Sequence, residues 1–129
     1  NNFGGENAEN FAVFYAEDAE LILGERHFKG RNGIMEAYGR APGQAPRPPP
    51  PPRYAFILAV DNPLIVVHRD NTATAQLVYT EYVIEKQGDQ VKVITQGKES
   101  STFVKAEAPW RYKTRLIRGG TELPEGWKE

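Results

Sequence analysis

The fold is decided by the stretch ATAQLVYTEYVIEK (residues 73–86), which is followed by QGDQ (87–90) and VKVITQGKESSTFVK (91–105). The two longer segments are rich in Val, Ile, Thr and Tyr, and the short polar one between them is typical of a turn. The pattern therefore predicts two long strands joined by a hairpin. Strands longer than the usual five or six residues twist and bend. Gly97, inside the second strand, is where we expect a bulge or bend.

Further strands are predicted on both sides of this hairpin. Before it, residues 54–60 and 64–68 form one strand, interrupted by a bulge or turn at Asp61-Asn62-Pro63, and residues 69–72 form a hairpin turn. After it, residues 106–109 turn and residues 110–118 form the last strand. Alternation along that strand predicts a covered face of Trp110, Tyr112, Thr114 and Leu116 and an exposed face of Arg111, Lys113, Arg115 and Ile117.

Helices are predicted before the strands. Residues 6–18 carry Ala8, Phe11, Ala12 and Tyr15 at helical spacing, and residues 31–39 form a second helix with Asn32 as its N-cap. Residues 19–29 are expected to form a short strand pair or a bent strand between the two helices. Helices followed by hairpin-linked strands predict an α+β fold, in which a curved antiparallel sheet forms a cone around the N-terminal helices.

The chain of 129 residues is long enough for one domain, residues 1–129. A proline-rich connection at residues 40–53 contains the run Pro48 to Pro52, which is restricted to an extended polyproline conformation. This connection is either a stiff surface segment or a ligand for an aromatic groove of a partner. A C-terminal tail begins at residue 119. The opening Asn1-Asn2-Phe3-Gly4-Gly5 is more typical of a loop than of a protein start, so we expect a preceding segment.

Composition excludes several classes of function. The net charge is −1, from 16 basic and 17 acidic residues, which disfavours nucleic-acid binding, and no apolar run is long enough to span a membrane. Cysteine is absent, which excludes disulfides and thiol catalysis, and the two histidines do not form a motif for zinc. We expect a cytoplasmic protein without metal or cofactor.

Four segments, in order, resemble a known family. They are Tyr15 to Leu21 (YAEDAEL), Phe28 to Ile34 (FKGRNGI), the Asn62-Pro63 turn with Asp70 to Ala75 (DNTATA), and Gly97 to Phe103 (GKESSTF) with Trp110, Tyr112 and Arg115. Together they are similar to SnoaL-like proteins of the nuclear-transport-factor-2-like superfamily, which includes polyketide cyclases, dehydratases and ketosteroid isomerases. The resemblance implies a cone with a pocket. It also implies a carboxylate base at a position that Leu23 occupies here, and a histidine a few residues before Asn62, where this chain has the apolar stretch Phe56 to Val60.

Candidate catalytic residues are Glu81, Asp18 and Tyr15. A carboxylate among apolar side chains has a raised pKa, which suits proton transfer, and alternation places Glu81 beside Tyr79. The alternative is a solvated Glu81 paired with Lys98 or Arg111. Asp18 matches the family's junction aspartate or else holds a turn. Tyrosines such as Tyr15 can donate to a carbonyl or enolate oxygen. The expected ligand-binding residues are Tyr54, Phe56, Leu58, Tyr79, Phe14, His27 and Trp110.

Three functions follow from these expectations. The first is a cyclase, dehydratase or isomerase that moves a proton in a hydrophobic carbonyl compound. The second is a non-catalytic binding protein for an apolar ligand. The third is an interaction module that dimerises through the open face of the sheet. A homodimer is expected in each case, because Tyr82, Ile84 and Phe103 are too apolar for a solvated outer face.

Overall fold

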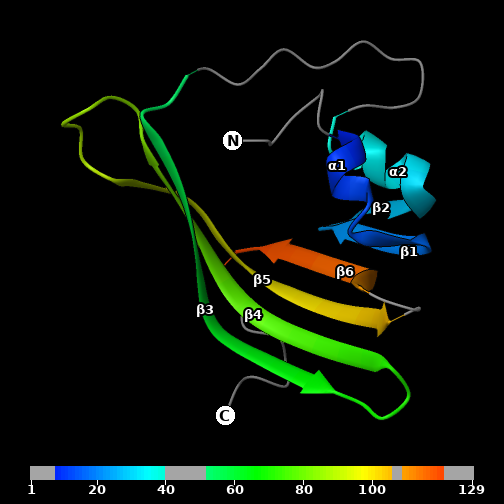
Figure 1. Cartoon of the computed structure of the whole chain (residues 1–129). Coiled ribbons are helices and arrows are strands. Elements are labelled where there is room, and N and C mark those ends of the chain that lie inside the picture. Colours follow the sequence, from blue (N-terminus) through cyan, green and yellow to red (C-terminus); the bar gives the residue numbers. More distant parts are fainter. Residues whose placement is uncertain (1–7, 40–51, 106–108, 121–129) are drawn as a thin grey trace.

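The protein is an α+β structure built on one curved, unclosed sheet (Figure 1). The computed structural model describes residues 8–39, 52–105 and 109–120. Their elements are α1 (Ala8–Ala12), β1 (Tyr15–Leu23), β2 (Arg26–Lys29), α2 (Gly30–Ala37), β3 (Ala55–Val67), β4 (Thr72–Ile84), β5 (Lys92–Lys105) and β6 (Trp110–Gly119). The strand order is β2-β1-β6-β5-β4-β3.

The pairing of the strands confirms the predicted hairpins and corrects one feature. All neighbouring strands are antiparallel except β1 and β6, which run parallel. This parallel contact pairs the first strand of the chain with the last, and both lie inside the sheet rather than at its edges. The predicted turns at Asn62 and Asn71 are confirmed by positive φ angles of 48° and 60°, and a register shift between Asp61 and Leu64 marks the expected bulge in β3.

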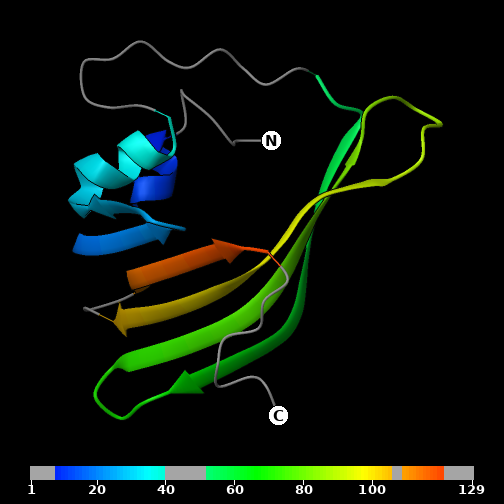
Figure 2. The same cartoon turned by 180° about the vertical axis from the view of Figure 1, so that it is seen from behind.

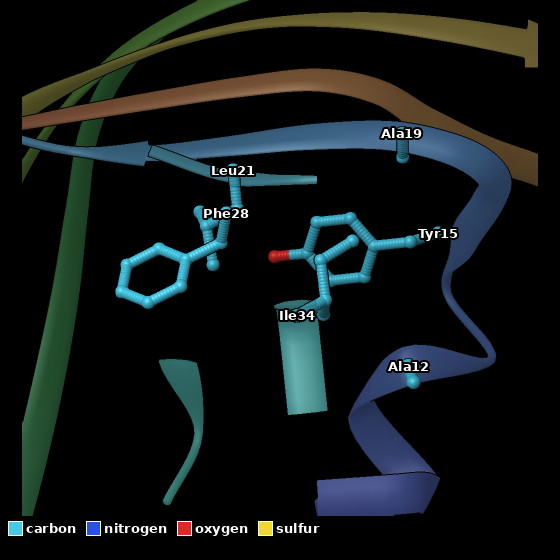
Figure 3. Close-up of a cluster of buried hydrophobic side chains, with 6 residues drawn as sticks. All are labelled: Ala12, Tyr15, Ala19, Leu21, Phe28 and Ile34. Atoms are coloured by element: carbon cyan, nitrogen blue, oxygen red, sulfur yellow. The ribbon is translucent and has the colours of Figure 1, made fainter. Parts of the chain in front are cut away.

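Both helices lie on the inner side of the bend in the sheet, over β1, β2 and β6 (Figures 1 and 2). The long strands β3, β4 and β5 extend beyond them. Six buried side chains from α1, β1, β2 and α2 point toward one another and form the core in Figure 3: Ala12, Tyr15, Ala19, Leu21, Phe28 and Ile34. The core thus covers the end of the sheet formed by β1 and β2, and these helices and their core residues do not cover the inner face of the long strands.

The predicted helix over residues 6–18 is wrong beyond Ala12. The α1 helix ends there, and β1 begins at Tyr15, which pairs with Tyr112 of β6. The Tyr112 amide also donates a hydrogen bond of 2.9 Å to the Phe14 carbonyl oxygen. Tyr15 therefore faces the core as a strand residue, because pairing with a distant strand overrides the local helical spacing.

The second helix begins earlier than predicted. Gly30, with φ of 65°, starts α2 directly after β2, and the N-cap is Lys29 without a side-chain hydrogen bond. Asn32 lies inside the first turn, so its predicted capping role is wrong. The inward side of the helix contains Ile34, which is fully buried, and Met35, which packs against the core. Residues 48–51 of the proline run and most of the C-terminal tail lie outside the described residues.

Two irregularities decide which side chains share the inner face. Register shifts lie between Glu81 and Tyr82 on β4, and between Thr102 and Phe103 on β5. At the second, Phe103 pairs with Tyr112 and Thr102 pairs with Thr114, so Lys113 is an extra residue on β6. This bulge changes the phase of alternation along β6, and it turns Arg115 inward.

The predicted exposed face of the last strand is therefore wrong for Arg115 and Ile117. The Arg115 guanidinium lies over the Tyr112 ring at 4.9 Å, and Ile117 packs against the core. In the described part of the chain, neither helix is long and apolar enough to span a membrane.

Candidate functional site

A polar cluster lies under the helices on the inner face of the sheet, and Arg115 of β6 is at its centre. Its Nη1 donates hydrogen bonds to the Tyr15 hydroxyl at 3.1 Å and to the Tyr38 hydroxyl at 3.0 Å. Its Nη2 donates to Glu99 Oε2 at 2.7 Å. One guanidinium thus joins β1, the end of α2 and β5.

Glu99 is the anionic partner of this cluster. It is 7% exposed, and its second oxygen, Oε1, accepts a hydrogen bond of 2.7 Å from the hydroxyl of buried Ser101. Both residues lie on β5 with Gly97 on the same side, and Ser101 pairs with Arg115 across the sheet. A carboxylate held by a guanidinium and a hydroxyl is a charged partner rather than a free base.

Tyr15 and Tyr38 carry two hydroxyl protons, but only one of them is donated within the cluster. Their oxygens are 2.8 Å apart, so one hydroxyl donates to the other, and each oxygen also accepts from Arg115. Each tyrosine hydroxyl has a single proton. Tyr15 is 1% exposed whereas Tyr38 is half-buried, so the second proton is best placed on Tyr38, where a ligand oxygen can accept it.

Burial and charge act in opposite directions on the ionisable groups here. Burial raises the pKa of Tyr15 strongly, and the Arg115 charge offsets only part of that increase. For Arg115, burial lowers the pKa, but the hydrogen bond to Glu99 and the charges around it more than reverse this, so its pKa is raised. Arg115 is therefore a permanent cation and Tyr15 a neutral hydrogen-bonding group at physiological pH.

Aromatic rings surround the cluster in a continuous row. Phe11 stacks on Tyr38 with ring centroids 4.7 Å apart, Tyr15 stacks on Tyr112 at 5.1 Å, and Tyr112 contacts Phe103 at 4.5 Å. Phe103 was expected on the outer face, and its contact with Tyr112 places it inside instead. Apolar rings around a hydrogen-bond donor are typical of small-molecule sites.

The structure brings two of the predicted site residues to this face besides Tyr15. Tyr79 of β4 lies over Gly97 of β5. Burial raises the pKa of Tyr79, and the negative charges of Glu81 and Glu99 raise it further. Glu81 is half-buried and lies two residues further along β4. Leu77 is the strand partner of Glu99, so Glu81 lies four residues from the cluster along the strand, or about 13 Å of backbone.

The other predicted residues lie apart from the cluster. Asp18 is exposed and paired with Lys113, which lowers its pKa by a hydrogen bond and by charge. His27 is exposed, and its Nδ1 lies 2.9 Å from Glu20 Oε1. Leu58 of β3 and the nearby Tyr54 are exposed, and Phe56 is half-buried. Phe14 is exposed after α1, and Trp110 is partly exposed beside Lys105 at 5.9 Å.

Sequence reasoning missed Arg115, Glu99, Ser101 and Tyr38 as members of one site. The available signal was the row Gly97, Glu99 and Ser101, in which small and polar residues occupy three successive inward positions of a long strand. Its partner Arg115 could not be recognised from the sequence, because the bulge at Lys113 moves it to the face opposite to the one that alternation predicts. Within residues 8–39, 52–105 and 109–120, no group of three or more His, Asp or Glu side chains gathers to hold a metal ion.

Comparisons with known proteins agree with this architecture. The model of the SnoaL-like domain family matches residues 4–116. Among curated proteins none matches the chain. A scytalone dehydratase-type protein of Novosphingobium aromaticivorans superposes with a TM-score of 0.64 at 16% identity, covering 88% of this chain and 71% of that one.

Two further solved structures have similar folds. ActVI-ORFA of Streptomyces coelicolor gives a TM-score of 0.65 at 12% identity, covering 88% of this chain and 82% of that one. A nuclear transport factor 2-like protein of Salmonella enterica gives 0.62 at 22% identity, covering 94% and 82%. Identities this low establish the fold but not a reaction. Because the family model covers most of the sequence, the chain belongs to the SnoaL-like domain family.

Proposed function

We propose that the chain binds a small apolar carbonyl compound on the inner face of the sheet, with the Tyr38 hydroxyl donating to the carbonyl oxygen. The observation that carries the proposal is the triangle of Arg115, Tyr15 and Tyr38, which leaves one hydroxyl proton without an acceptor inside the cluster. The aromatic row and the apolar side chains of β3 and β4 supply the contact surface. Arg115 polarises the donor, since a cation that donates to a hydroxyl oxygen strengthens the hydrogen bond that the hydroxyl gives.

Proton transfer on this ligand is the second part of the proposal, and Glu81 is its acid or base. Glu81 is half-buried on the same strand as Tyr79, and no ion pair with another described residue holds it. Glu99 has Arg115 and Ser101 as fixed partners, so it is less suited to exchange a proton. The ligand would then present its carbonyl to Tyr38 and its reacting position toward Glu81, in a cyclase, dehydratase or isomerase reaction. Dehydration is included in this class because the scytalone dehydratase-type protein has a similar fold.

Titration with 2-acetylnaphthalene, a rigid aromatic ketone, tests the binding proposal. We expect the unaltered chain to bind it and Tyr38→Phe to bind about fivefold more weakly, since one neutral hydrogen bond contributes about 1 kcal/mol. Isothermal calorimetry measures both. Tyr82→Phe is the matched control, because the alternation along β4 points Tyr82 away from Tyr79 and Glu81. Equal affinities for all three chains would contradict the role of Tyr38, and no binding at all would contradict the proposed function.

We also propose that the chain forms a homodimer, and β3 is the observation behind it. This strand is at the edge of the sheet and exposes aliphatic side chains on both of its faces: Ile57, Leu58, Val60, Leu64, Ile65, Val66 and Val67. Large exposed apolar surfaces of this kind are usually covered by a partner. Light scattering after gel filtration is expected to give twice the 14.5 kDa of one chain, and Leu64→Lys is expected to shift the mass toward the monomer. A monomer at micromolar concentration would contradict the dimer.

A further inference from the structure

The charge around the tyrosine cluster restricts which ligands fit there. Arg115 is the cation nearest to the proposed donor, and its charge is already matched by Glu99 at 2.7 Å. Glu99 is held on its other side by Ser101. A ligand carboxylate therefore cannot use Arg115 as a free counter-ion unless it displaces a buried carboxylate, which is costly.

A second carboxylate acts on the same part of the face. Glu81 and Glu99 both contribute to the raised pKa of Tyr79, after burial, and Arg115 opposes them. Tyr79 lies against Gly97, between the cluster and Glu81. The surface that a ligand would cover between Tyr38 and Glu81 is thus bordered by two carboxylates and one guanidinium. An anionic ligand meets repulsion there that a neutral one does not.

We propose that Glu99 is a specificity-determining residue that makes this site accept neutral carbonyl ligands and reject carboxylates. Glu99 does not touch the ligand in this arrangement. It acts through Arg115, by neutralising the guanidinium whose Nη1 donates to both tyrosine hydroxyls. The inference rests on the proposed function, because it names the ligand class for the same site.

A pair of probes of matched shape tests the inference. The neutral ketone 2-acetylnaphthalene and the anion 2-naphthoate have the same ring system and one carbonyl group each. We expect the unaltered chain to bind naphthoate at least about tenfold more weakly than the ketone, because the anion meets two carboxylates and a paired guanidinium. In Glu99→Gln, the guanidinium loses its partner, and we expect naphthoate to bind about tenfold more tightly while the ketone changes little.

Two further variants separate charge from structure. Ser101→Ala removes a hydrogen bond to Glu99 but keeps its charge, so the preference for the ketone should persist. Glu81→Gln removes the second carboxylate without breaking the buried pair, so this variant should bind naphthoate more tightly than the unaltered chain does. It tests the effect of charge also in the case that Glu99→Gln does not fold.

The outcomes distinguish this inference from the proposed function. If the unaltered chain binds naphthoate as well as the ketone, the selectivity is overturned, although the site still binds carbonyl compounds. If folded Glu99→Gln gains no affinity for naphthoate, Glu99 is not the determinant. If the unaltered chain binds neither probe, the proposed function fails and the inference fails with it.

Discussion

Replacing Glu99 by glutamine is expected to lower the free energy of unfolding by about 3 kcal/mol, because it leaves a largely buried guanidinium without its anion. Glu99 is 7% exposed and the Arg115 side chain 24%. Breaking such a pair from one side typically costs about 3–5 kcal/mol, and the residual exposure of Arg115 places this variant at the lower end. The Ser101 hydroxyl also loses its charged acceptor. Urea denaturation followed by circular dichroism measures the change.

Two comparisons identify the origin of this loss. Asp18→Asn removes the carboxylate from a pair with Lys113 that is exposed on both sides, so it should change stability little. Combining Glu99→Leu with Arg115→Met removes both charges, and it should recover much of the loss, because apolar side chains can replace a buried ion pair. If Glu99→Gln were as stable as Asp18→Asn, the buried pair would not be a major contributor to the stability of the sheet.

The strands and the hairpins that join them could be predicted from the sequence because their signals are local. The turns at Asn62 and Asn71 adopt positive φ angles that asparagine tolerates, and the long strands have the expected composition. The parallel contact between β1 and β6 could not be read in this way. It pairs residues almost 100 positions apart, such as Leu21 with Arg115, and no local pattern encodes such a contact.

The site was harder to predict than the fold because a single extra residue changes the face of a strand. Strict alternation assigns Arg115 to the exposed side of the last strand, opposite to Tyr112. The bulge at Lys113 reverses this assignment and places both side chains on the inner face. Tyr15 was a candidate because a tyrosine can donate to a carbonyl oxygen. It was expected on a helix that in fact ends at Ala12, so the predicted helix does not explain its place in the cluster.

Gly97 connects the two halves of the inner face, and its replacement by alanine is expected to be among the most destabilising single-methyl changes in the chain. A bulge or bend was expected here, and the register of β5 is regular at this position on both sides, so Gly97 is not a bulge. The reason for glycine is close packing instead. A methyl group would lie 2.5 Å from the Tyr79 hydroxyl oxygen and 2.7 Å from Tyr79 Cζ, and it would also collide with the Arg118 carbonyl oxygen. An aromatic ring lying over a strand glycine is a known way to stabilise such a position.

The expected loss for Gly97→Ala is about 3 kcal/mol, at the upper end for overpacking, because one of the colliding atoms belongs to the backbone and cannot rotate away. Gly119 provides the matched control, since it is the strand partner of Gly97, and a methyl group there has only Thr95 Oγ1 nearby, at 3.9 Å. Gly119→Ala should therefore be close to neutral. Adding Tyr79→Leu to Gly97→Ala should recover part of the loss but not all of it, because the Arg118 carbonyl remains. Full recovery of stability in the double variant would assign the whole cost to the Tyr79 ring. Equal losses for Gly97→Ala and Gly119→Ala would mean that the cost comes from losing a glycine in a strand. In that case it would not come from the contact that positions Tyr79 beside the cluster.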